Sequence, residues 1–182
     1  VESLEPDIAV PQTMADTLAG RDTAVEWLLA HPETLEQREY PDAPLTRGRF
    51  VGLLYAAAGS PAAAAEAGFQ DLLSIEWFLP AVNWAAETGV TGGTAEGAFA
   101  AARHLTWQEA AVFLVRTVEA LGLEPEAVRT APLPDALAEG AWDQTALELA
   151  WEWGLLPEDA GSAAEIARVQ GGAMADAFAA LL

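Results

Sequence analysis

Two arginines stand at the start of predicted helices, where a guanidinium group can take part in binding. Arg47 ends a Leu-Thr-Arg run and Arg168 ends an Ile-Ala-Arg run. A planar guanidinium can form paired, charge-assisted hydrogen bonds with a carboxylate, and the positive end of the helix dipole favours the same anion. An arginine at this position can also be exposed to solvent or pair with a carboxylate of its own chain, so these alternatives stay open.

The sequence gives no comparable indication of catalysis or of metal binding. Cysteine is absent, which excludes thiolate metal sites, disulfides and cysteine nucleophiles. His31 and His104 are far apart and have no His or Cys neighbours, so they do not predict a metal site. No known catalytic motif occurs, and no pattern selects a pair of acidic residues for glycoside hydrolysis. We therefore expect a protein that is not an enzyme and that needs no metal or cofactor.

Acidic residues dominate the chain. It has 28 Asp and Glu against 8 basic residues, all of them Arg, which gives a formal net charge of −20. Nucleic acid is a poor candidate partner, because binding to phosphates needs clustered basic side chains. No apolar run approaches the roughly 20 residues of a membrane span, and the first residues lack the basic and apolar regions of a signal peptide. We therefore expect a globular protein without membrane insertion.

The elements that would position the two arginines recur three times along the chain. Each copy predicts a first helix that stops at Pro or Gly, then a loop and a second helix. The first helices align at Ala24, Ala81 and Ala146, their stops are Pro32, Gly89 and Gly154, and the second helices begin near Leu45, Leu105 and Ile166. Arg47 and Arg168 thus occupy equivalent positions in the first and third copies.

Local sequence supports these helix boundaries. Thr-x-x-Glu capping boxes begin at Thr23, Thr106 and Thr145. In the third copy, the run from Ser162 to Glu165 predicts an earlier start of the second helix. A short connecting helix is expected over residues 61–67, and a linker over residues 124–134.

The second helices have apolar residues at helical spacing. These are Phe50, Leu53, Leu54 and Ala57 in the first copy, and Met174, Ala177, Phe178 and Leu181 in the third. A pair of short helices cannot bury such a stripe alone, so we expect the three copies to pack around a common axis. Alternating segments are too short for a sheet, and the predicted fold class is all-α.

The middle copy, from Phe69 to Gly122, has a recognisable order of features. It starts with an aromatic-x-Asp run and continues with a Trp, an Ala-rich helix, a Gly-rich turn and a Thr-led second helix. This order resembles the S-layer homology (SLH) repeat, and less similar copies lie on both sides. The resemblance implies three helix-loop-helix SLH repeats in a pseudo-threefold arrangement around a central helical bundle. We expect the repeats at residues 1–60, which include an N-terminal segment, 61–124 and 125–182.

The resemblance also implies a function. SLH modules anchor exported proteins non-covalently to the bacterial cell wall by binding secondary cell-wall polysaccharide, often through a pyruvylated amino sugar, in grooves between repeats. The expected partner is therefore a cell-wall glycan, and the expected location is extracellular, at the cell wall or in the S-layer. An alternative is a surface-layer assembly or protein-interaction module that no longer binds glycan and that self-associates within the layer.

The most specific SLH motif, Thr-Arg-Ala-Glu at the start of the second helix, is incomplete in every copy. The three runs are Thr46-Arg47-Gly48-Arg49, Thr106-Trp107-Gln108-Glu109 and Ala167-Arg168-Val169-Gln170. Trp107 thus replaces the arginine of the middle copy, and a Trp can stack on a sugar face. The glycan-binding residues implied by the resemblance are Arg47, Arg168, Trp107, Gly92, Gly93, Asp71 and Trp77.

Each of these residues also has a structural alternative. The Gly92–Gly93 turn can simply end a helix, and an Asp such as Asp71 or Asp135 commonly caps the following turn. Aromatic residues at repeat-equivalent positions are usually core or packing residues. These positions are Trp27 and Trp84, and Trp77 and Trp142.

Overall fold

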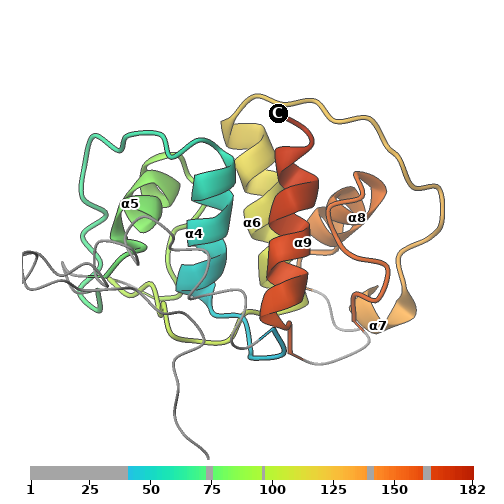
Figure 1. Ribbon diagram of the computed structural model, residues 1–182, viewed down its shortest axis with the longest axis horizontal. Coiled ribbons are helices and arrows are strands. Elements are labelled where there is room, and N and C mark those ends of the chain that lie inside the picture. The colour runs from blue at the N-terminus through green and yellow to red at the C-terminus, as the bar shows by residue number, and fades with distance from the viewer. Residues whose placement is uncertain (1–40, 73–75, 96, 139–141, 162–164) are drawn as a thin grey trace, which may run out of the picture. The chain divides into compact units, whose positions relative to one another are not determined.

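Helices account for all the regular structure in residues 41–72, 76–95, 97–138, 142–161 and 165–182, which the computed structural model describes (Figure 1). They are α4 (Arg47–Ala57), α5 (Leu79–Glu87), α6 (Trp107–Ala120), α7 (Asp135–Ala138), α8 (Gln144–Glu152) and α9 (Arg168–Ala179), labelled as in Figure 1. This confirms the predicted all-α class. Predictions for Thr23, Trp27 and His31 lie outside the described residues. Within those residues, every helix is too short or too polar to cross a membrane.

The second helices begin where the alignment of the copies predicts. Their first residues are Arg47 in α4, Trp107 in α6 and Arg168 in α9. The predicted capping box of α6 is confirmed, because Thr106 Oγ1 accepts a hydrogen bond from Glu109 N at 3.3 Å and Glu109 Oε2 accepts one from Thr106 N at 3.2 Å.

The predicted earlier start of α9 is wrong. Glu165 and Ile166 lie before the helix, which begins at Arg168. The reason lies in pairing with another segment: Ile166 O accepts a hydrogen bond from Leu45 N at 2.7 Å, and Arg168 N donates to Ala43 O at 2.9 Å. These bonds keep the chain extended up to the start of α9.

The predicted first helices of the second and third copies are α5 and α8, and both end as expected. Gly89 and Gly154 follow their C-caps with φ angles of 79° and 74°, which glycine adopts without strain. The capping role predicted for Thr145 is wrong, because this residue lies inside α8. Asp143 is the N-cap, and its Oδ1 accepts a hydrogen bond from Ala146 N at 3.1 Å.

The connecting helix predicted over residues 61–67 does not form. Side chains of α5 bond its N–H groups instead, because Ala64 N donates to Glu87 Oε2 at 2.7 Å and Ala67 N donates to Asn83 Oδ1 at 3.0 Å. The predicted linker over residues 124–134 is irregular, as expected.

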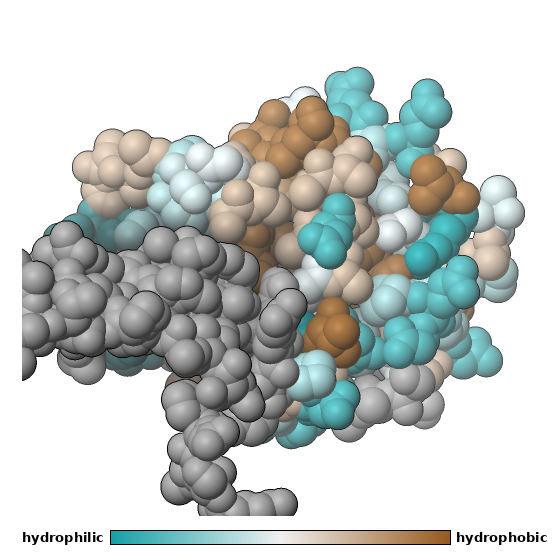
Figure 2. All heavy atoms as spheres, in the orientation of Figure 1, coloured by the Kyte–Doolittle hydropathy of each residue, from teal (hydrophilic) through white to brown (hydrophobic). Residues whose placement is uncertain are grey.

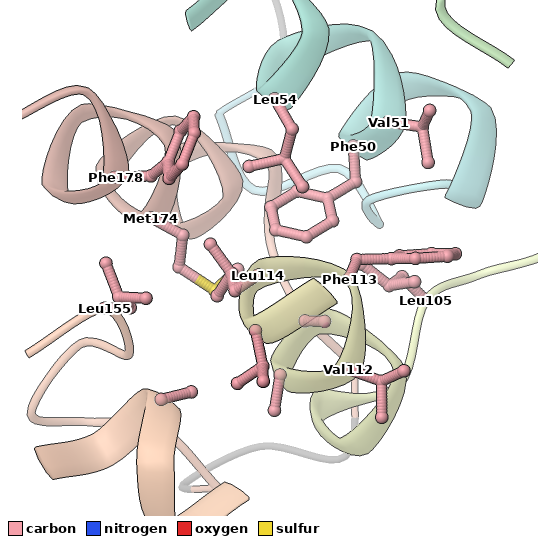
Figure 3. Packing of buried hydrophobic residues seen from close by; sticks show 14 of the residues in the cluster. Phe50, Val51, Leu54, Leu105, Val112, Phe113, Leu114, Leu155, Met174 and Phe178 are labelled. Carbon is pink, nitrogen blue, oxygen red and sulfur yellow. The ribbon is translucent and has the colours of Figure 1, made fainter. Parts of the chain in front are cut away.

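The core lies among α4, α6 and α9, which run side by side in Figure 1. Its fully buried side chains include Phe50 and Leu54 of α4, Leu114 of α6, and Met174 and Phe178 of α9, so the predicted apolar stripes are confirmed. Figure 3 shows Met174 directed towards Leu114. The shorter helices pack outside this core, α5 against α4 and α8 against α6.

The segments that precede α4, α6 and α9 are hydrogen-bonded to one another. In addition to the bonds that Leu45 and Arg168 make, Leu105 N donates to Leu45 O at 2.8 Å and Arg47 N donates to Arg103 O at 3.0 Å. Leu45, Leu105 and Ile166 occupy equivalent positions and are at most 1% exposed. Residues far apart in sequence therefore meet at the starts of these three helices.

Exposed hydrophobic residues are dispersed on the face drawn in Figure 2. They form small groups between hydrophilic residues, and one group lies over the C-terminal end of α9, where Leu182 is 61% exposed.

Candidate functional site

A groove runs beside α6 and is bounded by the Gly-rich turn at residues 91–93. Its first hollow, of about 180 Å³, is lined by this turn together with Arg47, Glu109, Arg116 and Trp142. A second hollow, of about 610 Å³, is lined by Arg116, Glu119, Thr88 and the beginning of the same turn. Because Thr91, Gly92 and Arg116 line both hollows, we treat them as one site and call it the α6 groove.

The two glycines of the turn differ in their surroundings. Gly93 has a φ of 85°, and a Cβ there would lie 2.5 Å from Ala98 O and 2.8 Å from a ring carbon of Phe69, so only glycine fits. A Cβ on Gly92 would have no atom within 4 Å. Gly93 therefore shapes the turn, whereas Gly92 leaves its backbone open to the groove.

Arg47 is held by its own chain. Its side chain is 4% exposed, its Nη1 donates to Glu109 Oε1 at 2.8 Å, and its Nε donates to Phe99 O at 3.1 Å. The rings of Phe99 and Phe113 lie 5.1 and 4.9 Å from its guanidinium carbon. This geometry is the pairing with a carboxylate of its own chain that the sequence analysis kept as an alternative. Arg47 also forms part of the wall of the first hollow.

Glu109 joins two arginines. Arg103 Nη2 donates to the same Oε1 that Arg47 binds. Burial raises the pKa of Glu109, but the hydrogen bonds from Arg103 and Thr106 N and the charges of the two arginines outweigh it, so the pKa lies below its ordinary value. Burial lowers the pKa of Arg47, and Glu109 opposes that shift. The carboxylate therefore stays ionised beside its arginine partners.

Asp71 supports the loop that faces the turn. Its Oδ1 and Oδ2 accept hydrogen bonds from Phe99 N at 2.9 Å and Ala100 N at 2.7 Å. The hydrogen bond from Phe99 N has the largest effect, and together with the bond from Ala100 N it holds the pKa of Asp71 below its usual range. Both carboxylate oxygens accept backbone hydrogen bonds, and Asp71 does not line the α6 groove. The geometry therefore corresponds to a structural role in binding backbone N–H groups.

Two tryptophans are exposed among the described residues, and they have different neighbours. Trp142 is 64% exposed, lines the first hollow, and donates its backbone N–H to Gln108 Oε1 at 3.1 Å. Trp77 is 55% exposed and packs edge-on against Phe78 and over Gly52, away from the residues that line the groove. Trp84, in contrast, is buried in the core as expected.

Two further predicted residues lie outside the α6 groove. Trp107 is 6% exposed and belongs to the core, so little of its ring is open to a sugar. Arg168 begins α9, and its buried Nε has no hydrogen-bond partner among the described residues. Of the seven predicted residues, the structure brings Arg47, Gly92 and Gly93 together in the groove.

Sequence reasoning missed Arg116. Glu109, Val112, Phe113 and Arg116 follow one another at helical spacing and line the same side of α6. This spacing is present in the sequence, but the Thr-Arg-Ala-Glu motif covers only the first turn of the helix and does not include Arg116.

Metal ligands are not grouped in the described part of the chain. No set of three His, Cys, Asp or Glu residues there could hold an ion. His104 is about half exposed, and its Nδ1 lies 2.9 Å from Glu165 Oε1.

A family model matches part of the chain, and the match includes some of the residues that line the groove. Residues 68–111 match the family model of the S-layer homology domain, and this span holds the Gly-rich turn, Asp71 and the start of α6. Domains of this family are generally anchoring modules that bind secondary cell-wall polymers, they indicate association with the cell surface, and they are not an enzyme family. No curated protein matches the chain. Residues 68–111 are thus similar to an S-layer homology domain.

Proposed function

We propose that this protein is a non-covalent anchoring module that binds secondary cell-wall polysaccharide in the α6 groove. The observation that carries the proposal is the combination of an open glycine backbone at Gly92, an exposed indole at Trp142 and the exposed cation Arg116, beside the buried, ion-paired Arg47, in one groove. Stacking on an aromatic face, close backbone approach and charge-assisted hydrogen bonds are the interactions that an acidic sugar can use.

We also propose three repeats, at residues 1–60, 61–124 and 125–182, related by a pseudo-threefold axis. Two observations support this arrangement. The helices α4, α6 and α9 begin at aligned residues, and their preceding segments are hydrogen-bonded. In addition, α5 packs on α4 and α8 packs on α6. In both cases the first helix of one copy packs against the second helix of the copy before it.

The ligand group that this groove would select is acidic. A pyruvylated amino sugar carries a carboxylate that a guanidinium can bind through paired hydrogen bonds. Arg168 is proposed as a secondary contact at the start of α9, because its Nε lacks a partner among the described residues. Binding to such a polymer would hold the protein outside the cell, at the wall or in the surface layer.

Sedimentation with purified wall sacculi tests this function. We expect the parent protein to sediment with intact sacculi and to remain in solution with sacculi stripped of their secondary polymer. Trp142→Ala should weaken binding about tenfold, since one aromatic stacking contact contributes roughly 1–2 kcal/mol. Trp77→Ala is the matched control, because Trp77 is similarly exposed but does not line the α6 groove.

Two outcomes would contradict the proposal. Equal binding to stripped and intact sacculi would show that the secondary polymer is not the ligand. Absence of binding together with self-association in analytical ultracentrifugation would favour the surface-layer assembly module instead.

A further inference from the structure

Arg116 is the unengaged cation of the α6 groove. It lies in the third turn of α6, is exposed, and lines both hollows. Within the described part of the chain its guanidinium makes no hydrogen bond and no ion pair. Arg47 and Arg103, in contrast, share Glu109, and Arg129 donates to Leu156 O at 2.6 Å and covers the ring of Trp151.

The charge of the first hollow, which Arg116 helps to line, is unusual for this chain. The protein has 8 arginines and a net charge of −20. Arg47 and Arg116 nevertheless line the first hollow together, and Arg103 bonds to its Glu109, which is the acidic residue among the described residues that line it. The first hollow therefore has more positive than negative groups, which attracts an anion in spite of the acidic surface elsewhere.

The position of Arg116 also bears on the length of the ligand. The first hollow, of about 180 Å³, is smaller than the roughly 300–1,000 Å³ of ordinary small-molecule sites, whereas the second measures about 610 Å³. The two meet at Thr91, Gly92 and Arg116. A ligand that occupies both hollows must therefore pass Arg116.

We infer that Arg116 binds an acidic group of the glycan directly, and that the glycan chain passes over it so that successive sugar units occupy the two hollows. This inference rests on the proposed function and adds a residue outside the Thr-Arg-Ala-Glu motif. It assigns to Arg116 the cationic contact that Trp107 cannot make in the middle copy. A carboxylate and a phosphate would both satisfy a planar guanidinium.

Sacculus binding by charge-matched variants tests the role of Arg116. Arg116→Gln should weaken binding by roughly tenfold or more, as expected for the loss of a charge-assisted hydrogen bond. Arg116→Lys keeps the charge and should retain part of the affinity. Ala127→Glu is the control, because it makes the same change in net charge on the exposed linker and should bind as the parent does.

Competition separates the two acidic groups and tests the ligand length. A pyruvylated amino sugar and a sugar phosphate are each titrated into the parent protein and sacculi. The sugar that carries the group bound by Arg116 should displace the parent protein from the sacculi, and it should displace Arg116→Gln only at higher concentrations. A disaccharide carrying that group should displace the parent protein from the sacculi at lower concentrations than the monosaccharide does.

The outcomes distinguish this inference from the proposed function. If the parent protein binds sacculi and Arg116→Gln binds equally well, the inference is wrong and the proposed function stands. Equal weakening by Arg116→Gln and Ala127→Glu would also overturn it, because overall charge would then explain the loss. A parent protein that does not bind sacculi overturns the proposed function and the inference with it.

Discussion

The starts of α6 and α9 are equivalent in the repeat alignment but differ in charge. The first hollow of the α6 groove has Arg47 and Arg116 in its lining. The hollow beside the start of α9, of about 400 Å³, is lined by Asp42, Asp159 and Glu165 and, among the described residues, by no arginine. We call this second site the α9 hollow.

The residue three positions into each helix explains part of the difference. In α6 this residue is Glu109, which binds Arg47 and Arg103. In α9 it is Gln170, whose Oε1 accepts a hydrogen bond from Ala167 N at 2.9 Å and whose Nε2 donates to Asp159 at 2.9 Å. Gln170 caps its helix as Glu109 does, but it attracts no arginine. One fold thus produces a first hollow with more positive than negative groups and an acidic α9 hollow, and the first hollow suits an acidic group better.

The largest effect is expected from Arg47→Ala. Glu109, whose side chain is 14% exposed, would lose its buried partner and keep only the more exposed Arg103, so the free energy of unfolding should fall by about 3 kcal/mol. Urea denaturation measures the loss. Arg103→Ala is the control, because Arg103 is 44% exposed and its ion pair should contribute less than about 1 kcal/mol. Equal losses in the two variants would contradict a structural role specific to Arg47.

A smaller effect on stability is expected from Gly93→Ala. The left-handed φ of 85° and the contact with Ala98 O should lower the free energy of unfolding by roughly 2 kcal/mol. Gly92→Ala has open space for its methyl group and should leave stability nearly unchanged while weakening sacculus binding. Thermal unfolding and sedimentation together separate the two effects. A Gly92→Ala protein that is stable and binds fully is incompatible with close approach of the ligand at this glycine.

The smallest effect should appear in the pH dependence of stability. Because the folded-state pKa of Glu109 lies below its ordinary value of 4.5, the stability it contributes is present above that pH and is lost as the pH falls through the folded pKa. The difference in unfolding free energy between the parent and Glu109→Gln should therefore shrink from about pH 6 to about pH 3. A difference that stays constant over this range would argue against an ionised Glu109 in the folded protein.

The sequence predicted several helix boundaries better than the site. Thr106 with Glu109, and the glycines Gly89 and Gly154, act on neighbouring backbone groups, so their effects were visible in short runs of sequence. The segment over residues 61–67 was mispredicted because its Ala-rich composition favours a helix, whereas Glu87 and Asn83 bind its N–H groups from α5.

The site depends on contacts between residues that are distant in sequence. Arg47 and Glu109 are 62 positions apart, and their pairing follows from how α4 packs beside α6. Trp142 reaches the first hollow from the segment before α8, and the motif did not include Arg116. Repeat alignment could identify equivalent positions, but it could not determine which of them would become buried, paired or exposed.

Hydrogen–deuterium exchange with purified secondary cell-wall polymer tests the central proposal most directly. We predict that bound polymer slows exchange most in peptides that cover residues 88–93 and α6, and only weakly at the start of α9, where Arg168 is the proposed secondary contact. Slower exchange confined to residues 165–170, or exchange that is unchanged throughout the chain, would contradict a glycan site in the α6 groove.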